Sequence, residues 1–394
     1  MYWPYFALGC NLEINSQRTS AYINNASSIV TGGIGANIDI SCDCPALNYV
    51  YDVDDVPQIA TYTTPAGDQA PWFDASISES ARFLGFVISD VTQNSVASRS
   101  VVTRVSSSGG GSIGPIRNKE RRLDFDVLMF ACDEASMEYG FRYLTDALGS
   151  SGCDDSCALC TAEYRESCPP IQGGAQLAES LNRGRWLLKN VGLVEGPVWA
   201  DTPIESLACN MRRVRFSLAS ELPWKFKCPV EVCSPIPIPA PVGPCSSFRD
   251  TAEVSCSVTE DLIIGETGMI INVHAGAVPL QHVKIHIRPD KFGYEALPLT
   301  RPPGYIRVPP CDSIEIREIP AGCTLEYDTS VETVRILVPG GGSYDATSLI
   351  DTESGIAPTF PTVRCGDFCV SIMASECSIL GNPYMSISSV HREI

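Results

Sequence analysis

Residues 123–130 read Leu-Asp-Phe-Asp-Val-Leu-Met-Phe, and this stretch decides the fold class. Apolar and acidic residues alternate with a period of two, which is typical of a strand with one face buried and one face in water. A similar alternation recurs at Phe83–Ser89 and at Arg212–Leu218, where Arg213 and Arg215 alternate with apolar neighbours. The N-terminal portion is therefore predicted to contain half-buried antiparallel strands.

One clear helix is predicted between Asp133 and Leu148. The hydrophobic period changes there from two to three or four residues. One stripe then collects the apolar side chains of Met137, Phe141, Leu144 and Leu148. Gly149 follows directly and is expected to end the helix.

A proline-rich linker divides the chain. Residues 228–245 read Cys-Pro-Val-Glu-Val-Cys-Ser-Pro-Ile-Pro-Ile-Pro-Ala-Pro-Val-Gly-Pro-Cys, and the alternating prolines favour an extended backbone. We expect one domain over residues 1–227 and a second over residues 246–394, where short alternating runs between turn signals predict an all-β sandwich or jelly roll. These runs are Glu253–Val258, Met269–His274, Val283–Ile287, Ser313–Glu318, Thr324–Tyr327 and Thr333–Val338.

Composition narrows the class of protein. Of the 394 residues 44% are hydrophobic and 19% are charged, and 31 glycines and 29 prolines punctuate the chain. This profile suits two or three β-rich domains. No apolar run approaches the ~20 residues of a membrane-spanning helix, and the first residues lack the pattern of a signal peptide. Neither membrane insertion nor export by the usual route is expected.

The net charge of the chain indicates which classes of binding partner to expect. A formal net charge of −18 makes binding of nucleic acid through a basic surface unexpected. The one dense basic cluster is Arg117-Asn118-Lys119-Glu120-Arg121-Arg122. It could meet an acidic surface of a neighbouring subunit, and it could equally be a solvated loop that leads into a strand.

The 18 cysteines include one dense cluster, Cys153, Cys157, Cys160 and Cys168, directly after the predicted helix. Four thiolates at this spacing could close a tetrahedral zinc site, and two disulfides would fit the same residues equally well. The spacing of the first three also occurs at iron–sulfur clusters of radical enzymes, but the sequence lacks the (β/α) barrel pattern that holds such a cofactor. A structural zinc ion is therefore a candidate, and no cofactor is required.

The sequence contains no motif that strongly indicates a catalytic site. The run Gly110-Gly111-Ser112-Ile113-Gly114 has the spelling of a hydrolase nucleophile elbow, which needs a strand before the serine and a helix after it. Here serines precede the motif and a proline follows it, so a hairpin loop is the better interpretation. We predict no catalytic residue and no enzymatic activity.

Two other groups are weak candidates for metal ligands. His282 and His286 alternate with apolar residues, so both are expected on the outward, polar face of a strand. Asp52, Asp54 and Asp55 lack the glycine turn and the distal glutamate of a calcium loop. Neither group is predicted to bind a metal.

Several short motifs follow one another in order across most of residues 1–227. They are Glu13-Ile14-Asn15-Ser16-Gln17-Arg18-Thr19, Ala70-Pro71-Trp72-Phe73-Asp74 followed by Phe83-Leu84-Gly85-Phe86, the glycine loop and basic run before Leu123, Met137-Glu138-Tyr139-Gly140-Phe141, the cysteine cluster that ends at Cys168-Pro169, Arg185-Trp186-Leu187 through Gly196-Pro197, and Arg212 to Trp224. In this order they resemble the minor tail proteins, of distal-tail type, of long-tailed siphophages that infect actinobacteria.

The resemblance implies a tail-tube-like β-barrel or sandwich with one packed helix, assembled as a hexameric ring where the tail tube meets the tail tip. The implied partners are identical subunits, the tail tube protein, the tail-tip hub and other minor tail proteins. The chain would then be a structural virion protein of the tail tip, synthesised in the host cytoplasm. A C-terminal β-sandwich, of jelly-roll or galectin-like type, would project outward.

An alternative function is that of a host-surface module that binds a carbohydrate or another receptor. Tyr294, Tyr305 and Tyr344 flank turns in the C-terminal domain and could stack on sugar rings. Such aromatic residues also pack in the core or along the edges of β-sandwiches, so the sequence leaves both roles open. A hydrolase with Ser112 as its nucleophile is the least favoured hypothesis.

Overall fold

The structure is a computed structural model of the whole chain. It describes residues 3–9, 11–29, 45–51, 57–92, 99–100, 103–105, 111–113, 117–149, 161–168, 177, 181–182, 184–200, 204–205, 210–238, 252–261, 265–290, 312–352, 360–362, 365–374 and 382–393. The chain divides into two compact units, unit 1 (Met1–Lys225, with Ile394) and unit 2 (Phe226–Glu393).

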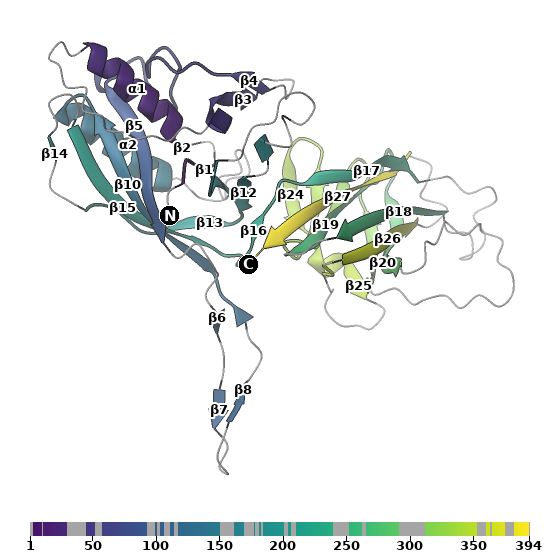
Figure 1. Cartoon of the computed structure of the whole chain (residues 1–394). Helices are drawn as coiled ribbons and strands as arrows, with labels where there is room; N and C mark the ends of the chain where they lie inside the picture. Colours follow the sequence, from purple (N-terminus) through teal and green to yellow (C-terminus); the bar gives the residue numbers. More distant parts are fainter. Residues whose placement is uncertain are drawn as a thin grey trace, which may run out of the picture. The chain divides into compact units, whose positions relative to one another are not determined.

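The central element of unit 1 is an antiparallel sheet with the strand order β13-β15-β10-β5 (Figure 1). Its strands are β5 (Phe83–Thr92), β10 (Arg121–Ala131), β13 (Val191–Trp199) and β15 (Asn210–Ser220), and the short β14 (Ile204–Glu205) pairs with β15. The predicted alternation is confirmed on β10, because Phe125 and Val127 are buried while Asp124 and Asp126 lie on the other face.

A second sheet, with the order β2-β1-β11-β12, shares the hydrophobic core of unit 1. Its strands are β1 (Tyr5–Leu8), β2 (Leu12–Asn15), β11 (Ala162–Arg165) and β12 (Arg185–Leu188). Trp3, next to β1, stacks on Tyr164 of β11 with ring centroids 4.2 Å apart, and it meets Phe125 of β10 edge-on at 5.6 Å. The described strands of unit 1 thus form a two-sheet sandwich, one of the two forms that the resemblance implies.

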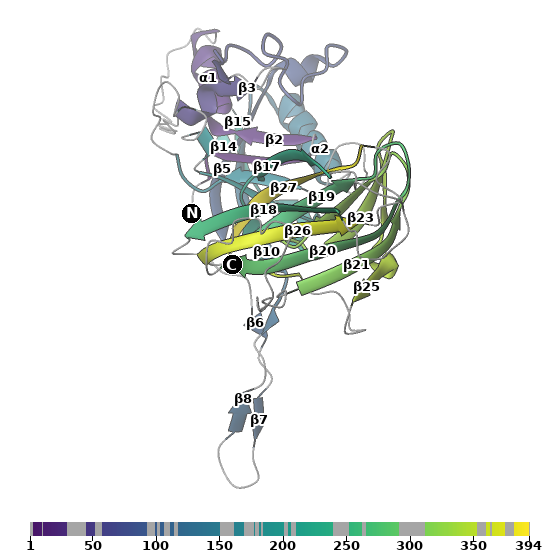
Figure 2. The same cartoon turned by 90° about the vertical axis from the view of Figure 1, so that its right-hand side faces the viewer.

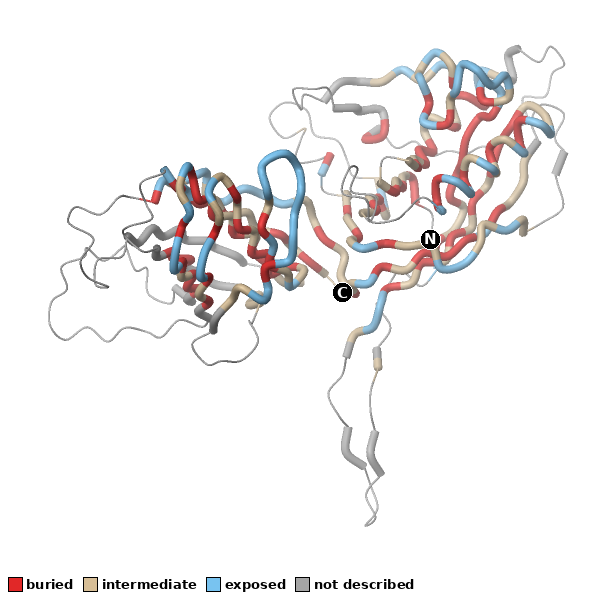
Figure 3. The backbone as a smooth tube through the Cα atoms, turned by 180° about the vertical axis from the view of Figure 1, so that it is seen from behind, coloured by how far each residue is buried: buried red, intermediate tan, exposed pale blue. Residues whose placement is uncertain are grey.

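The predicted helix is present as α2 (Glu134–Gly149). Asp133 caps its start, because Oδ1 of Asp133 accepts a hydrogen bond from the backbone N–H of Ser136 at 2.8 Å. Met137 and Leu144 of the predicted apolar stripe are fully buried and pack into the core of unit 1. The helix therefore covers the inner face of the central sheet, and Figure 3 marks the buried residues along the backbone in red.

Unit 1 also contains α1 (Ser16–Ile29), so the prediction of a single helix is wrong. This helix is rich in serine, asparagine and threonine, which are weak helix formers, and it has no strong apolar stripe. Tyr22 and Ile23 are nevertheless buried in the core, and α1 packs beside β5. Tertiary packing, rather than local propensity, holds this segment in a helix.

Strands β5 and β10 are the two arms of a hairpin that continues beyond the sheet (Figure 1). Thr92 pairs with Asp124, and further out the paired strands are β6 (Arg99–Ser100) with β9 (Arg117–Asn118), and β7 (Thr103–Val105) with β8 (Gly111–Ile113). Each of these outer pairs is a sheet of two strands in the part of the chain that the structure describes. We call strands β6 to β9 the hairpin extension.

Several short elements complete unit 1. They are η1 (Pro45–Asn48), β3 (Tyr49–Tyr51), β4 (Pro57–Ile59) and η2 (Ser78–Ala81), with β16 (Lys225–Phe226) at the boundary of the units. Between β4 and β5 the indole N–H of Trp72 donates to the backbone oxygen of Phe83 at 3.0 Å. This bond fixes the loop before β5 onto the aromatic core.

Unit 2 is a sandwich of two antiparallel sheets, one of which Figure 2 shows face-on. The first sheet has the order β27-β19-β22-β23-β24, with β17 on the other side of β27, and the second has the order β18-β26-β20-β21-β25. The strands are β17 (Val230–Pro237), β18 (Ala252–Asp261), β19 (Glu266–His274), β20 (Leu280–Asp290), β21 (Asp312–Ile319), β22 (Thr324–Asp328), β23 (Thr333–Val338), β24 (Gly342–Asp345), β25 (Ile350–Thr352), β26 (Cys365–Ala374) and β27 (Tyr384–Glu393), with η4 (Thr347–Leu349) before β25. The chain is mainly β and unit 2 is a β-sandwich, as predicted.

Strand β17 lies within the proline-rich stretch 228–245. Proline lacks a backbone N–H group, so it is tolerated on an edge strand whose donors on one side need no partner. β17 is such a strand, since among the described residues it pairs with β27 and with no other strand. Part of the sequence read as a linker is thus built into the sheet of unit 2.

Candidate functional site

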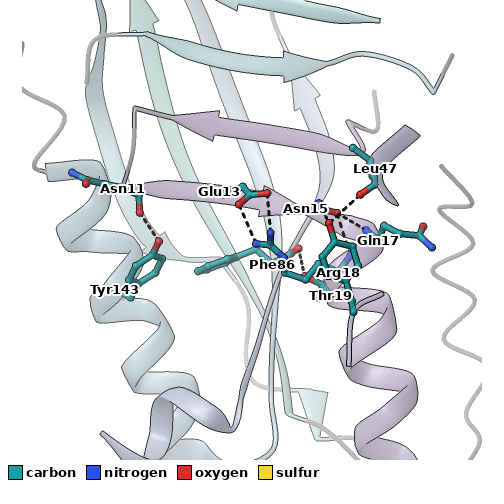
Figure 4. A network of polar contacts seen from close by, with 10 residues as sticks. Asn11, Glu13, Asn15, Gln17, Arg18, Thr19, Leu47, Phe86 and Tyr143 are labelled. Carbon is teal, nitrogen blue, oxygen red and sulfur yellow. Dashed lines mark hydrogen bonds and ion pairs between the residues drawn. The ribbon is translucent and has the colours of Figure 1, made fainter. Parts of the chain in front are cut away.

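The first motif of the resemblance forms a polar network at the start of α1, shown in Figure 4. Glu13 on β2 accepts two hydrogen bonds from the guanidinium group of Arg18, at 3.1 and 3.2 Å. Asn15 caps the helix, because its Oδ1 accepts hydrogen bonds from the backbone N–H groups of Gln17 and Arg18, each at 3.1 Å. A parallel fork between guanidinium and carboxylate fixes orientation as well as distance.

The same network reaches other segments of unit 1. Nδ2 of Asn15 donates to the hydroxyl of Tyr62 at 3.2 Å, and that hydroxyl donates to the backbone oxygen of Leu47 at 3.0 Å. Oγ1 of Thr19 donates to the backbone oxygen of Phe86 at 2.9 Å. The hydroxyl of Tyr143 donates to the backbone oxygen of Asn11. Burial raises the pKa of Tyr62, against the opposing effect of the nearby Arg18 cation, so its hydroxyl stays a donor. These groups satisfy one another inside the unit, which suits positioning of elements rather than chemistry on a substrate.

The outward face of the central sheet carries a ladder of charges. Arg122 contacts Asp124 on its own strand and Glu195 on β13, each at 2.9 Å. Asp126 forms ion pairs with Arg213 and Arg215 of β15, and the Nε atom of each arginine lies 3.2 Å from a carboxylate oxygen of Asp126. Exposed ion pairs contribute little to the stability of the fold. Their main effect is to hold positive and negative side chains at fixed positions on this face.

The basic cluster 117–122 differs from its prediction. Arg121 is buried, with 1% exposure, and its Nε donates to the backbone oxygen of Pro223 at 3.1 Å. Burial lowers the pKa of its guanidinium group. Arg122 is paired within its own chain, and Lys119 is exposed. The cluster is therefore neither a uniform basic patch nor a simple solvated loop, because the strand period turns Arg121 toward the interior.

The cysteine cluster lies mostly outside the described residues. Cys153, Cys157 and Cys160 belong to that part, whereas Cys168 is described and is disulfide-bonded. The thiols of Cys132, Cys228 and Cys323 are free. Two disulfides among these four cysteines and a zinc site held by them both stay predictions. No group of three or more metal-ligating side chains occurs among the residues that the structure describes.

The other candidate residues do not assemble into a catalytic arrangement. Ser112 lies on β8 opposite Arg104 of β7, so it sits in a hairpin and not between a strand and a helix. His282 is exposed and contacts Glu315 at 3.2 Å. His286 is buried, against the expectation that it faces water, and its cross-strand neighbours are Ser313 of β21 and Ser371 of β26. Asp52, Asp54, Asp55, Tyr294 and Tyr305 lie outside the described residues, and Tyr344 is 44% exposed on the edge strand β24.

One arrangement in unit 2 was not predicted. Side chains from four neighbouring strands line up across the outward face of the first sheet, which we call the polar face. Its members are Asn272 and His274 on β19, Thr324 and Glu326 on β22, Arg335 on β23, and Tyr384 and Ser386 on β27. The alternation within each strand shows which residues point outward, but the register between strands decides which of them become neighbours.

No helix in the described part of the chain has the length and apolar character needed to cross a lipid bilayer.

Comparison with known proteins gives weak similarities. No family model and no curated protein sequence matches the chain. Among solved structures, the SPP1 Dit protein, described as a paradigm of the hub adsorption apparatus in phages that infect Gram-positive bacteria, is similar with a TM-score of 0.38 and 12% identity over 78% of this chain and 93% of that one. An uncharacterised Listeria monocytogenes protein in complex with glucose, magnesium and calcium gives a TM-score of 0.17 and 8% identity over 76% of this chain and 22% of its own. A chain from the structure of infectious bursal disease virus gives a TM-score of 0.16 and 8% identity over 74% of this chain and 72% of its own. Similarities this low assign neither a fold nor a function.

Proposed function

We propose that this chain is a non-enzymatic structural protein of a siphophage tail, in which unit 1 assembles with copies of itself into a ring, of six subunits, at the distal end of the tail tube. The ring would join the tube to the tail tip and would contact the tail tube protein, the tail-tip hub and other minor tail proteins. The order of sequence motifs in residues 1–227 supports this family, and the hairpin extension is the observation that carries the assembly.

The hairpin extension continues the pairing of β5 with β10 outward, with a register shift of one residue at β6–β9, and has no third strand beside it among the described residues. A two-stranded hairpin without a sheet or a hydrophobic face to pack on is marginally stable in water. An arm of this kind is stabilised when it packs on another surface, and a second copy of the chain supplies one in a closed ring. This argument needs no catalytic group.

The charge of the chain fits a tail component through which DNA passes. Phosphate backbones are held by lysine and arginine, and a net charge of −18 disfavours such contacts. On the outward face of the central sheet the arginines at 122, 213 and 215 are already paired with Asp124, Glu195 and Asp126. A ring built from this unit would let DNA pass without holding it.

The mass of the assembled protein tests the proposal. Native mass spectrometry of the full chain at high concentration should show a closed oligomer, with six copies as the expected number. A variant in which Ser100 is joined to Arg117 through an Asn-Gly turn loses β7 and β8 but keeps the β6–β9 pair. This variant should melt like the parent chain and should remain monomeric.

Two results would contradict the proposal. If the shortened variant assembles like the parent chain, the hairpin extension does not hold the ring. If the parent chain is monomeric and also fails to bind isolated tail tubes, the structural role in the tail is wrong.

We further propose a second function, attachment to a carbohydrate of the host surface through unit 2. The specific observation in its favour is the polar face, where an exposed aromatic ring lies among side chains with hydroxyl, amide, imidazole and carboxylate groups. The two functions are compatible, since they use different units of the chain.

A further inference from the structure

We infer that the polar face of unit 2 is a binding site for a short neutral oligosaccharide, with Tyr384 as the surface on which a sugar ring stacks. This inference rests on the second proposed function and names its site. It replaces the sequence-based candidates Tyr294, Tyr305 and Tyr344 by a residue whose surroundings the structure defines.

The aromatic part of the site is Tyr384 together with His274. Their rings are stacked, with centroids 4.7 Å apart and planes inclined by 29°. His274 is held from its other side by Thr324, whose hydroxyl lies 3.0 Å from Nδ1 of the imidazole. Tyr384 is 37% exposed, so its ring is oriented by His274 and still reaches the surface. A rigid aromatic ring packs on the C–H face of a sugar with little loss of side-chain freedom.

The polar part of the site lies one row further along the same strands. Ser386, Asn272, Glu326 and Arg335 are direct cross-strand partners in that order. Nε and Nη2 of Arg335 both contact Oε1 of Glu326, at 3.2 and 2.6 Å, and Oε2 of Glu326 has no hydrogen-bond partner among the described residues. Oδ1 of Asn272 has no partner there either, but it is buried and out of reach of a ligand. The groups of this row that a sugar hydroxyl can use are the second carboxylate oxygen of Glu326, as an acceptor, and the half-exposed guanidinium group of Arg335, as a donor.

The two rows together have the size of an extended ligand site. Neighbouring strands lie about 4.8 Å apart, so the four strands from β27 to β23 span about 14 Å. The turn after β23 contains Gly340, Gly341 and Gly342, at which a β-carbon would meet nothing within 4 Å. These three glycines carry no side chain at the end of the sheet where Tyr384 and His274 lie, which favours the approach of an elongated ligand from that side.

The charges of the site favour a neutral sugar over an acidic one. The positive charge of Arg335 is compensated by Glu326 at 2.6 Å. Asp345, the cross-strand partner of Arg335 on β24, adds a carboxylate that is exposed and accepts hydrogen bonds from Thr347. An anionic sugar would meet this negative charge, and the whole chain is acidic as well.

A protein partner is less well matched to this face. The centre of a protein–protein interface is usually apolar, with several large side chains that become buried together. Here Tyr384 is the one aromatic side chain that exposes more than a third of its surface, among the described residues of this face, and the other well-exposed large side chain, Arg335, is charged. Its neighbours in both rows are mostly polar, which suits a ligand covered with hydroxyl groups.

Binding of the labelled full chain to an array of defined neutral and acidic oligosaccharides tests the inference, followed by titration of the best glycan in solution. The parent chain should bind one or more neutral oligosaccharides. Tyr384→Ala should weaken binding roughly five- to tenfold, and Tyr384→Phe, which keeps the ring, should bind nearly as well as the parent. Tyr344→Ala is the matched control, because Tyr344 is similarly exposed but pairs with the inward-facing Ile336. It should bind like the parent.

The possible results of this experiment test the location of the site and the glycan-binding function separately. If the parent chain binds a neutral glycan and Tyr384→Ala binds it equally well, the site is wrong while glycan binding stands. If Tyr344→Ala is the variant that loses binding, the site lies at the sheet edge instead. If the parent chain binds no glycan on the array, or acidic ones alone, both the inference and the attachment function in its proposed form are overturned.

Discussion

Gly140 on α2 lies directly against the ring of Phe83 at the start of β5, so closely that a β-carbon at position 140 would lie 2.1 Å from Cε2 of that ring. Phe83 is fully buried and is itself packed edge-on by Trp72 and Phe86, with centroids 5.4 and 4.9 Å away. The ring cannot move aside without displacing its neighbours. Helix α2 and β5 are therefore in contact through a residue that tolerates no side chain.

We predict that Gly140→Ala lowers the free energy of unfolding of unit 1 by about 1–3 kcal/mol, the usual effect of overpacking a core. Urea denaturation of the full chain, followed by tryptophan fluorescence, measures this change. Gly149→Ala is the control, because Gly149 ends the same helix and a β-carbon there would meet nothing within 4 Å. Equal losses in both variants would show that helix composition, and not the contact with Phe83, sets the effect.

A second prediction concerns the pair of Arg18 and Glu13. The side chain of Arg18 is 11% exposed and that of Glu13 27%, so the pair is partly shielded from water. A double-mutant cycle with Arg18→Met and Glu13→Gln should give a coupling energy of about 1–3 kcal/mol. The exposed pair Arg142–Glu138, 77% and 51% exposed on α2, should give no more than about 0.5 kcal/mol in the same experiment. A coupling as small as that of the exposed pair would mean that the network at α1 positions nothing.

A third prediction concerns the stability of unit 2 in acid. The pKa of Glu315 is lowered, because hydrogen bonds and charges from Lys284 and His282 outweigh the opposing effect of burial. A carboxylate whose pKa is lower in the folded state contributes stability that is present above its unfolded pKa and is lost as the pH falls through the folded value. Between neutral pH and about pH 4 or below, Glu315→Gln should therefore lose less stability than the parent chain. Chemical denaturation at several pH values measures the difference, and parallel curves for both proteins would refute it.

A fourth prediction concerns the cysteines. Alkylation of the denatured chain without reductant, read by peptide mass spectrometry, should modify Cys132, Cys228 and Cys323, which are free thiols. Cys168 and Cys233 should stay unmodified until a reductant is added, since both are disulfide-bonded. If Cys168 is instead alkylated once a chelator is present, together with Cys153, Cys157 and Cys160, the four residues hold zinc.

Much of the fold follows from local sequence pattern. β10 was predictable because its alternation is regular, and α2 because its apolar residues repeat at helical spacing. α1 was not, since Asn24 and Asn25 and several serines disfavour a helix. The signal that could have found it is the capping residue Asn15, followed by Thr19, Tyr22 and Ile23, which are all buried.

The sites were less predictable than the fold, for a physical reason. The alternation at Met269–His274 correctly indicates that Asn272 and His274 face away from the core. It contains no information that Tyr384, more than a hundred residues later, becomes the cross-strand neighbour of His274. Contacts of this kind depend on register between distant strands, which one sequence does not specify locally.

The position of β27 in its sheet has a consequence for how the protein is made. This strand, Tyr384–Glu393, lies between β17 and β19 and forms pairs with both. During translation unit 1 can begin to fold as soon as its strands have left the ribosome, because domains generally fold as units from the N-terminus. The first sheet of unit 2 must wait until residue 393 has emerged, and until then β17 and β19 lack the strand that separates them. Nascent chains stalled before residue 384 should therefore contain a protease-resistant unit 1 and a protease-sensitive unit 2.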